Sequence, residues 1–126
     1  MNRVTIRGKL PSLNEYIAAC RANKFEGAKM KQETETAILW QIGRLQQITA
    51  PVIIHFIWHE KTRRRDKDNV AFAKKFVLDA LQKSGKLPND NNRFIAGFSD
   101  AFTYGTDYGV TIEVESAEAG VQEWSG

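Results

Sequence analysis

Two aspartates stand two residues apart in the segment RRRDKDN, which spans residues 63–69. In an extended segment, residues i and i+2 point to the same side about 7 Å apart, so Asp66 and Asp68 can hold a hard cation together. Carboxylate oxygens favour magnesium, with manganese as the other suitable ion. Asp90 is a third candidate ligand, because the turn in which it lies can return it to the start of the preceding helix.

The same segment has an alternative interpretation that needs no metal. Asp-x-Asp-Asn before an apolar helix is also typical of a loop followed by a helix N-cap, with Asp68 as the capping residue. Short motifs of this kind often occur without function. The spacing alone therefore favours the cap.

Arginines and lysines surround the two aspartates. Guanidinium groups match phosphate oxygens in geometry and charge, so the segment predicts a metal ion that meets a phosphodiester. The chemistry would be hydrolysis by a metal-activated water. The side chains expected to contact a DNA backbone are Arg63, Arg64, Arg65, Lys67 and Lys74.

One lysine is a candidate for the chemistry itself. On a continuous helix, Lys75 lies seven residues after Asp68 and only about 20° from it around the axis, whereas Lys74 points elsewhere. Lys75 is therefore predicted to face the metal site and to stabilise charge at the phosphate. The alternative is an exposed ion pair with Asp79, one turn later, which would contribute little.

The charge of the chain is unevenly distributed. Residues 61–86 hold nine basic and three acidic side chains, a local charge of +6, although the chain of 126 residues carries only +3. The remainder is therefore slightly acidic. A basic region on an acidic body indicates a polyanionic partner, and the alternative is a solvated lysine-rich helix beside a basic loop.

Other residues carry weaker signals. No stretch approaches the ~20 apolar residues of a membrane span, and the first residues lack a signal-peptide core, so we expect no membrane partner and a cytoplasmic location. Cys20, the one cysteine, is expected to be a buried thiol. His55 and His59 lie in a strand pattern about 13 Å apart, which argues against a zinc site, and Trp40 is expected in the core.

Hydrophobic periodicity and turn residues predict an α+β domain with a small mixed or antiparallel sheet and helices mainly on one face. Ser12 and Glu15 form a capping box at the first helix. A single domain is expected over residues 1–115, with a loose tail over 116–126. The expected strands are 4–8, 52–58, 93–102 and 110–114, the last two joined by a hairpin at 104–109, and the expected helices end near 22, run over 25–48 and run over 69–84.

The central block RRRDKDNVAFAKKFVLDAL, followed by GKLPNDNNRFI, resembles the RusA family of Holliday junction resolvases, which phages and prophages carry. That family has an Asp-x-Asp-Asn, a lysine, an Asp-Ala-Leu, a glycine and an acidic pair before a strand. PSLNEY near the start is similar to the opening Pro-x-x-Asn-x-Tyr of the family. The matching residues here are Asp66, Asp68, Asn69, Lys75, Asp79, Ala80, Leu81, Gly85, Asn89, Asp90, Asn14 and Tyr16.

The resemblance implies a magnesium-dependent endonuclease that acts as a homodimer on four-way and other branched DNA in a bacterial host. It assigns the metal to Asp66, Asp68 and Asp90 and an assisting role to Lys75. Two departures from the family pattern stand out. The lysine comes three residues later than usual, and Asn89 replaces one acid of the acidic pair.

Two alternatives remain at this stage. One is a DNA- or RNA-binding module without catalysis that uses the basic region 61–86. The other keeps the nuclease but changes its substrate to flaps, forks or RNA. Metal-dependent cleavage separates the first alternative from an enzyme, and competition among nucleic-acid structures tests the second.

Overall fold

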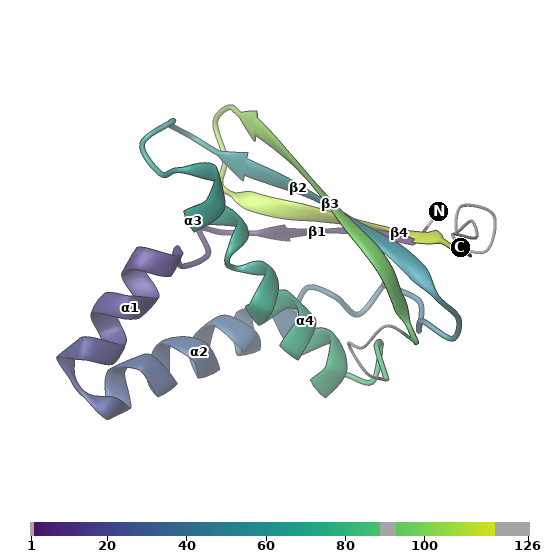
Figure 1. Ribbon diagram of the computed structural model, residues 1–126, viewed down its shortest axis with the longest axis horizontal. Helices are drawn as coiled ribbons and strands as arrows, with labels where there is room; N and C mark the ends of the chain where they lie inside the picture. The colour runs from purple at the N-terminus through teal and green to yellow at the C-terminus, as the bar shows by residue number, and fades with distance from the viewer. Residues whose placement is uncertain (1, 89–92, 118–126) are drawn as a thin grey trace, which may run out of the picture.

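The computed structural model describes residues 2–88 and 93–117. Within them, two helices follow each of the first two strands, and two strands end the described chain. Asp90 and most of the expected tail lie outside the described residues. Figure 1 shows the arrangement of the elements. They are β1 (Asn2–Arg7), α1 (Leu13–Ala22), α2 (Lys24–Leu39), β2 (Val52–Glu60), α3 (Lys67–Ala71), α4 (Lys74–Lys83), β3 (Ile95–Tyr104) and β4 (Gly109–Ser116).

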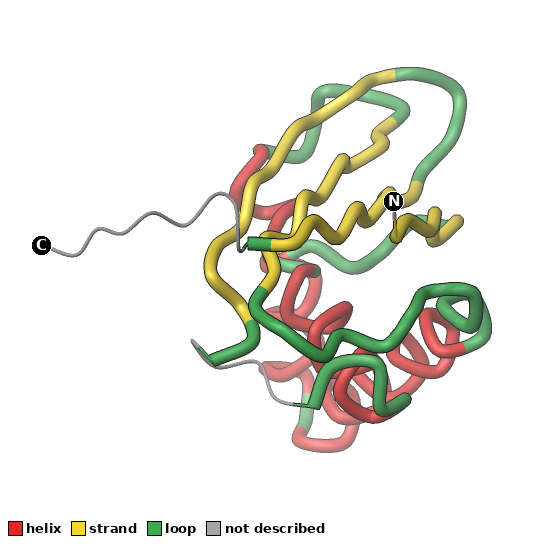
Figure 2. Tube along the Cα trace, turned by 90° about the vertical axis from the view of Figure 1, so that its right-hand side faces the viewer, coloured by secondary structure: helices red, strands yellow, loops and turns green. Residues whose placement is uncertain are grey.

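The strands form one mixed sheet in the order β1-β4-β2-β3. β2 runs parallel to β3 and antiparallel to β4. Alternate residues of β2, from Val52 to Glu60, are buried, because the helices cover the side of the sheet to which they point (Figures 1 and 2). The predicted α+β class, with a mixed sheet and helices mainly on one face, is confirmed.

The predicted hairpin between the last two strands is wrong. β2 lies between β3 and β4, and the connection crosses the end of β2, where the Gly105 amide donates to the Glu60 carbonyl at 2.9 Å. β4 takes the inner position because Val110, Ile112 and Val114 are buried in the core. The turn-rich connection satisfied the local pattern of a hairpin, but burial decided which strands are neighbours.

The second predicted helix ends nine residues early, at Leu39 rather than residue 48. Beyond it, Ile42, Leu45 and Ile48 are buried at a spacing of three residues. A tight turn supports this spacing, since the Leu45 amide donates to the Ile42 carbonyl at 3.0 Å. Trp40 is 84% exposed, so its predicted place in the core is also wrong.

The predicted helix over 69–84 is divided into α3 and α4. Between them the Ala73 amide donates to the Val70 carbonyl at 3.2 Å, and the Phe76 amide donates to the Ala73 carbonyl at 3.0 Å. Such i to i+3 bonds tighten the backbone to about 3 residues per turn, which adds about 20° of rotation per residue relative to an α-helix. The continuous α-helix that the angular argument for Lys75 and Asp68 assumed is therefore not present.

The first helix follows its sequence pattern closely. The Glu15 amide donates to Ser12 Oγ at 3.2 Å, and the Ser12 amide donates to Glu15 Oε1 at 2.9 Å, which confirms the capping box. α1 docks onto the rest of the molecule through Tyr16, whose ring lies 5.7 Å from that of Phe72 and 5.5 Å from that of Phe76. This contact joins α1 to the segment that carries the aspartates.

Two further expectations concern single residues and membranes. Cys20 is exposed, so the expected burial of its thiol is wrong. It lies where α1 passes close to Gly27 of α2, and a side chain at Gly27 would collide with Cys20 Sγ. Within the described residues, none of the helices combines the length and the apolar character that crossing a membrane requires.

Candidate metal and nucleic-acid site

The paired aspartates flank the first residue of α3, at the end of the sheet where β2 and β3 finish (Figure 1). Asp66 is the N-cap residue, but its side chain makes no capping hydrogen bond. Asp68 accepts one hydrogen bond, from the Asn69 amide at 3.0 Å. The N-cap is therefore Asp66 rather than the predicted Asp68, and within the described residues most of the carboxylate oxygen capacity of both side chains is unused.

Neither aspartate forms an ion pair within the described part of the chain, although three arginines immediately precede them. Both side chains belong to exposed residues. The extended segment whose spacing predicted that the two side chains point to one side is not present, because α3 begins at Lys67 and Asp68 is already a helix residue. As exposed carboxylates, both can still bind a divalent cation. In donor type and charge, Asp66 and Asp68 fit magnesium or manganese.

A full ligand set is not present within residues 2–88 and 93–117. No three His, Cys, Asp or Glu side chains in these ranges lie close enough together to hold a metal ion. Asp90, the third expected ligand, is outside them. The described residues thus supply two of the three predicted carboxylates.

Lys75 forms an ion pair with Asp79, which was the alternative prediction for this lysine. Its Nζ lies 3.6 Å from Asp79 Oδ1, and its side chain is 62% exposed. Lys31 of α2 also approaches Asp79, at 3.7 Å. Lys75 therefore lies in a groove between α2 and α4, together with the nearly buried Glu35 and its partner Lys83.

The Lys74 side chain is held against the sheet by an ion pair and is only partly exposed to solvent. Its Nζ lies 2.9 Å from Asp100 Oδ2 on β3, and the indole of Trp58 donates to Asp100 Oδ1 at 2.8 Å. Lys74 also lies 4.8 Å from the ring centroid of Phe98. Because Asp100 already balances its charge, Lys74 is a weaker candidate for phosphate than the sequence suggested.

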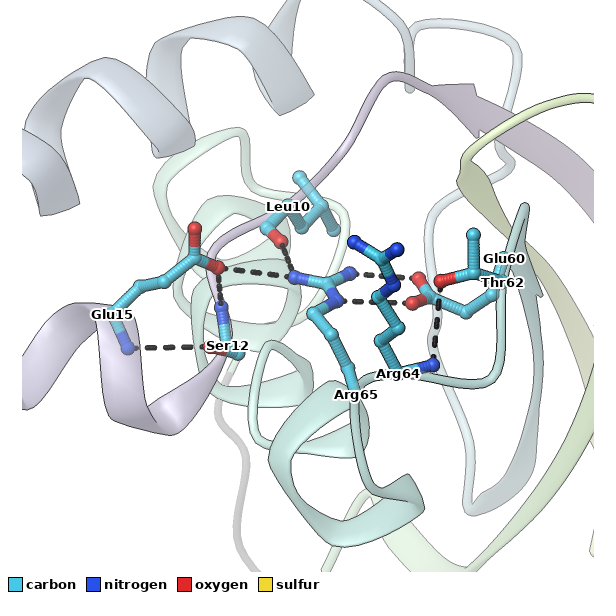
Figure 3. A network of polar contacts seen from close by, with 7 residues as sticks. All are labelled: Leu10, Ser12, Glu15, Glu60, Thr62, Arg64 and Arg65. Carbon is cyan, nitrogen blue, oxygen red and sulfur yellow. Dashed lines mark hydrogen bonds and ion pairs between the residues drawn. The ribbon is translucent and has the colours of Figure 1, made fainter.

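Arg65 has a structural role, because its side chain is hydrogen-bonded to other parts of the fold (Figure 3). Its Nε and Nη2 donate to the two oxygens of Glu60, at 2.9 and 2.7 Å. Its Nη1 donates to the Leu10 carbonyl at 2.9 Å and to Glu15 Oε1 at 3.1 Å. The side chain is 16% exposed and that of Glu60 only 4%. Arg65 has little donor capacity left for phosphate.

The charges of this network reinforce one another. Burial alone would lower the pKa of Arg65, but the hydrogen bonds and charge of Glu60, followed by those of Glu15, raise it above its ordinary value. Burial alone would raise the pKa of Glu15, but the hydrogen bonds from Ser12 and the charges of Arg65 and Lys9 lower it. The network therefore ties the start of α1 to the end of β2, and it favours the charged forms of Arg65 and Glu15.

The remaining basic residues of the loop face outward. The Arg64 backbone amide donates to Thr62 Oγ1 at 3.3 Å, while its guanidinium makes no bond to the residues drawn beside it (Figure 3). Arg63 stacks on Tyr104, with its guanidinium carbon 3.9 Å from the ring centroid. Lys67 lies 5.8 Å from the same centroid. These three cations retain their capacity to contact phosphate.

The sequence reasoning missed the aromatic residues that organise these cations. Tyr104 and Tyr108 lie at the two ends of the connection between β3 and β4. Lys9 and Lys61 approach the Tyr108 ring at 5.1 and 5.4 Å. The sequence pattern that could have identified them is TYGTDYG, which places two tyrosines at the two ends of a turn-rich segment. We name Lys9, Lys61, Arg63, Lys67, Tyr104 and Tyr108 the cation–tyrosine ridge.

Comparison of the chain with known protein families and with curated proteins gives no match. The class that the fold defines is a small α+β protein with a mixed four-stranded sheet.

Proposed function

We propose that the protein is a RusA-like, magnesium-dependent endonuclease that cleaves branched DNA, the four-way junction above all. The observation that carries the proposal is the pair Asp66 and Asp68. These carboxylates lack cationic partners within the described residues and adjoin the cation–tyrosine ridge through Lys67, which lies between them in sequence. The sequence pattern around them, which resembles the RusA family, supports the same reaction.

Each group has a distinct part in this proposal. Magnesium, when bound, supplies a nucleophilic water and polarises a phosphoryl oxygen. Asp66 and Asp68 hold the ion, and Asp90 is the proposed third ligand. Arg63, Arg64 and Lys67 bind neighbouring phosphates and so place the phosphodiester beside the carboxylates. Lys75 is retained as an assisting cation only if its ion pair with Asp79 opens.

A homodimer completes the proposal for junction resolution. Two-fold symmetry would present two equivalent active sites to two symmetry-related strands of a four-way junction. Sedimentation of the protein with and without junction DNA would test this assembly. A monomer that remains monomeric on the junction would contradict paired cleavage.

The central experiment measures cleavage and binding of a labelled four-way junction with magnesium and with a chelator. Asp68→Asn should reduce cleavage by at least about 100-fold, since even groups that only support metal ligands contribute about 10- to 100-fold. Junction binding should persist, because the ridge is unchanged. Glu33→Gln is the matched control: Glu33 is an exposed acid on α2, and its substitution should leave cleavage intact.

The second candidate function is a nucleic-acid-binding module without catalysis. The ridge favours it independently of the aspartates, because stacked cations and tyrosines bind nucleic acid without any metal. Junction binding with no magnesium-dependent cleavage would select this module over the nuclease, whereas cleavage unaltered by Asp68→Asn would exclude Asp68 as a metal ligand.

A further inference from the structure

Two adjoining hollows open beside Tyr108, at the end of the sheet. One is lined by Arg7, Lys9, Lys61 and Asp107, and the other by polar residues of the open sheet face and by the connection between β3 and β4. Arg7, Asp107 and Tyr108 line both. The second hollow has a volume of about 340 Å³, within the range of small-molecule sites. The two form one groove around the Tyr108 ring.

The first hollow is suited to an anion. Lys9 and Lys61 lie near the Tyr108 ring, and neither pairs with a carboxylate within the described residues. The backbone of Arg7 is fixed by Gln41, which accepts from the Arg7 amide at 2.7 Å and donates to the Arg7 carbonyl at 3.1 Å. Three cations against one acid, Asp107, leave a positive excess that matches a phosphate.

The second hollow has a polar, internally bonded floor. His59 contacts Thr103 through Nδ1 at 2.8 Å and Thr111 through Nε2 at 2.7 Å. Thr111 also contacts Thr5, at 2.9 Å between the two hydroxyl oxygens. Hydroxyl oxygens retain acceptor capacity after one bond, so this floor can hydrogen-bond a sugar or a base edge. It is not an apolar pocket.

We propose that this groove binds a nucleotide of single-stranded nucleic acid, with its base stacked on Tyr108 and its phosphate on Arg7, Lys9 and Lys61. The cations of the first hollow, the Tyr108 ring and the polar floor of the second suit a ligand that joins an anion to a flat polar ring. A paired duplex keeps its bases stacked on each other, so only an unpaired base can reach the tyrosine. The proposal deepens the proposed function, because it assigns selection of unpaired strands to the same end of the sheet as Asp66 and Asp68.

The backbone geometry makes Tyr108 a clean site for substitution. The Gly8 amide donates to the Tyr108 carbonyl at 3.0 Å, so the connection stays tethered to the end of β1 whatever side chain it carries. Tyr108→Ala removes the ring, Tyr108→Phe keeps it, and Tyr108→Leu keeps apolar volume without an aromatic face. Thermal unfolding of each variant establishes that the fold is retained.

The test is fluorescence anisotropy of a labelled 12-nucleotide single strand and of the blunt-ended duplex formed with its complement, in a chelator so that no cleavage occurs. Tyr108→Ala and Tyr108→Leu should weaken single-strand binding by about 5- to 100-fold, as the loss of one stacked base does, and Tyr108→Phe should retain it. Duplex binding should change much less. Lys61→Ala should lower the slope of log affinity against log salt by about 0.7.

Trp40→Ala provides the matched aromatic control, because Trp40 is 84% exposed and is no part of the groove. Equal single-strand affinity for the native protein and Tyr108→Ala would overturn the proposal, as would equal losses for strand and duplex. Asp68→Asn should bind the single strand normally. Failure of the nuclease proposal would therefore appear in the cleavage assay alone, and failure of the groove in these affinities alone.

Discussion

Arg63 and Arg65 are the same residue type two positions apart, yet their surroundings differ completely. Arg65 is 16% exposed and donates four hydrogen bonds, two of them to the nearly buried Glu60. Arg63 lies on the half-buried ring of Tyr104 and pairs with no carboxylate within the described residues. One arginine holds the loop to the body of the protein, and the other faces the solvent from that loop.

This difference shows how a fold divides a basic segment between stability and binding. A buried arginine needs a carboxylate to offset its lost hydration, and in gaining one it loses the donors that phosphate requires. An arginine on an aromatic face keeps its in-plane N–H donors. Anchoring at Arg65 therefore allows Arg63 and Lys67 to be presented at a defined place beside Asp66 and Asp68.

The largest expected effect is that of breaking the buried pair. Arg65→Ala removes the two donors that bond the carboxylate of Glu60, whose side chain is 4% exposed in the native protein, and this should cost about 3–5 kcal/mol of unfolding free energy. Urea unfolding followed by circular dichroism measures it. Arg63→Ala is the matched control and should change stability by no more than about 1 kcal/mol, the contribution of an exposed cation–π contact.

A double substitution sharpens the same comparison. Arg65→Met with Glu60→Leu removes both charges and should recover most of the lost stability, because apolar replacement of a buried pair is often neutral. A loss of similar size from both arginine variants would contradict the division between a structural and a binding arginine.

The next effect concerns binding and should appear at Arg63. Arg63→Ala should weaken binding to branched DNA and lower the slope of log affinity against log salt by about 0.9, the contribution of one phosphate contact. Titrations at several salt concentrations measure both quantities. An unchanged slope would mean that the guanidinium on Tyr104 makes no phosphate contact.

The smallest effect is the pH dependence at the edge of the anchored network. The pKa of Glu15 is lowered in the folded protein, so its contribution is present above the ordinary glutamate pKa of about 4.3 and is lost as the pH falls through the lower folded value. The side chain is 49% exposed, so solvent screens most of the effect. Between pH 6 and 3, the free energy of unfolding should fall less steeply for Glu15→Gln than for the native protein. An identical fall would contradict the coupling of Glu15 to Arg65 and Ser12.

Local patterns were sufficient for parts of the fold. The capping box at Ser12 and Glu15 and the end of α1 at Ala22 were predicted from sequence, because a cap depends on neighbours within one turn. The strand over β2 was also predicted, since its run VIIHFIW is mostly β-branched and aromatic, although its burial alternates along Val52–Glu60 instead of being complete. The choice of Asp66 and Asp68 as candidate ligands also came from local spacing.

Long-range contacts decided the rest. The order of β3 and β4 depended on which strand buries more apolar surface against the helices, and the end of α2 depended on how Ile42, Leu45 and Ile48 reach the core. The division between Arg63 and Arg65 depended on Glu60, Glu15 and Tyr104, which come from three separate elements. By itself the sequence determined which groups carry charge and roughly which segments form strands and helices. Only the tertiary structure decided which charges are buried, because burial and pairing arise between segments that are distant along the chain.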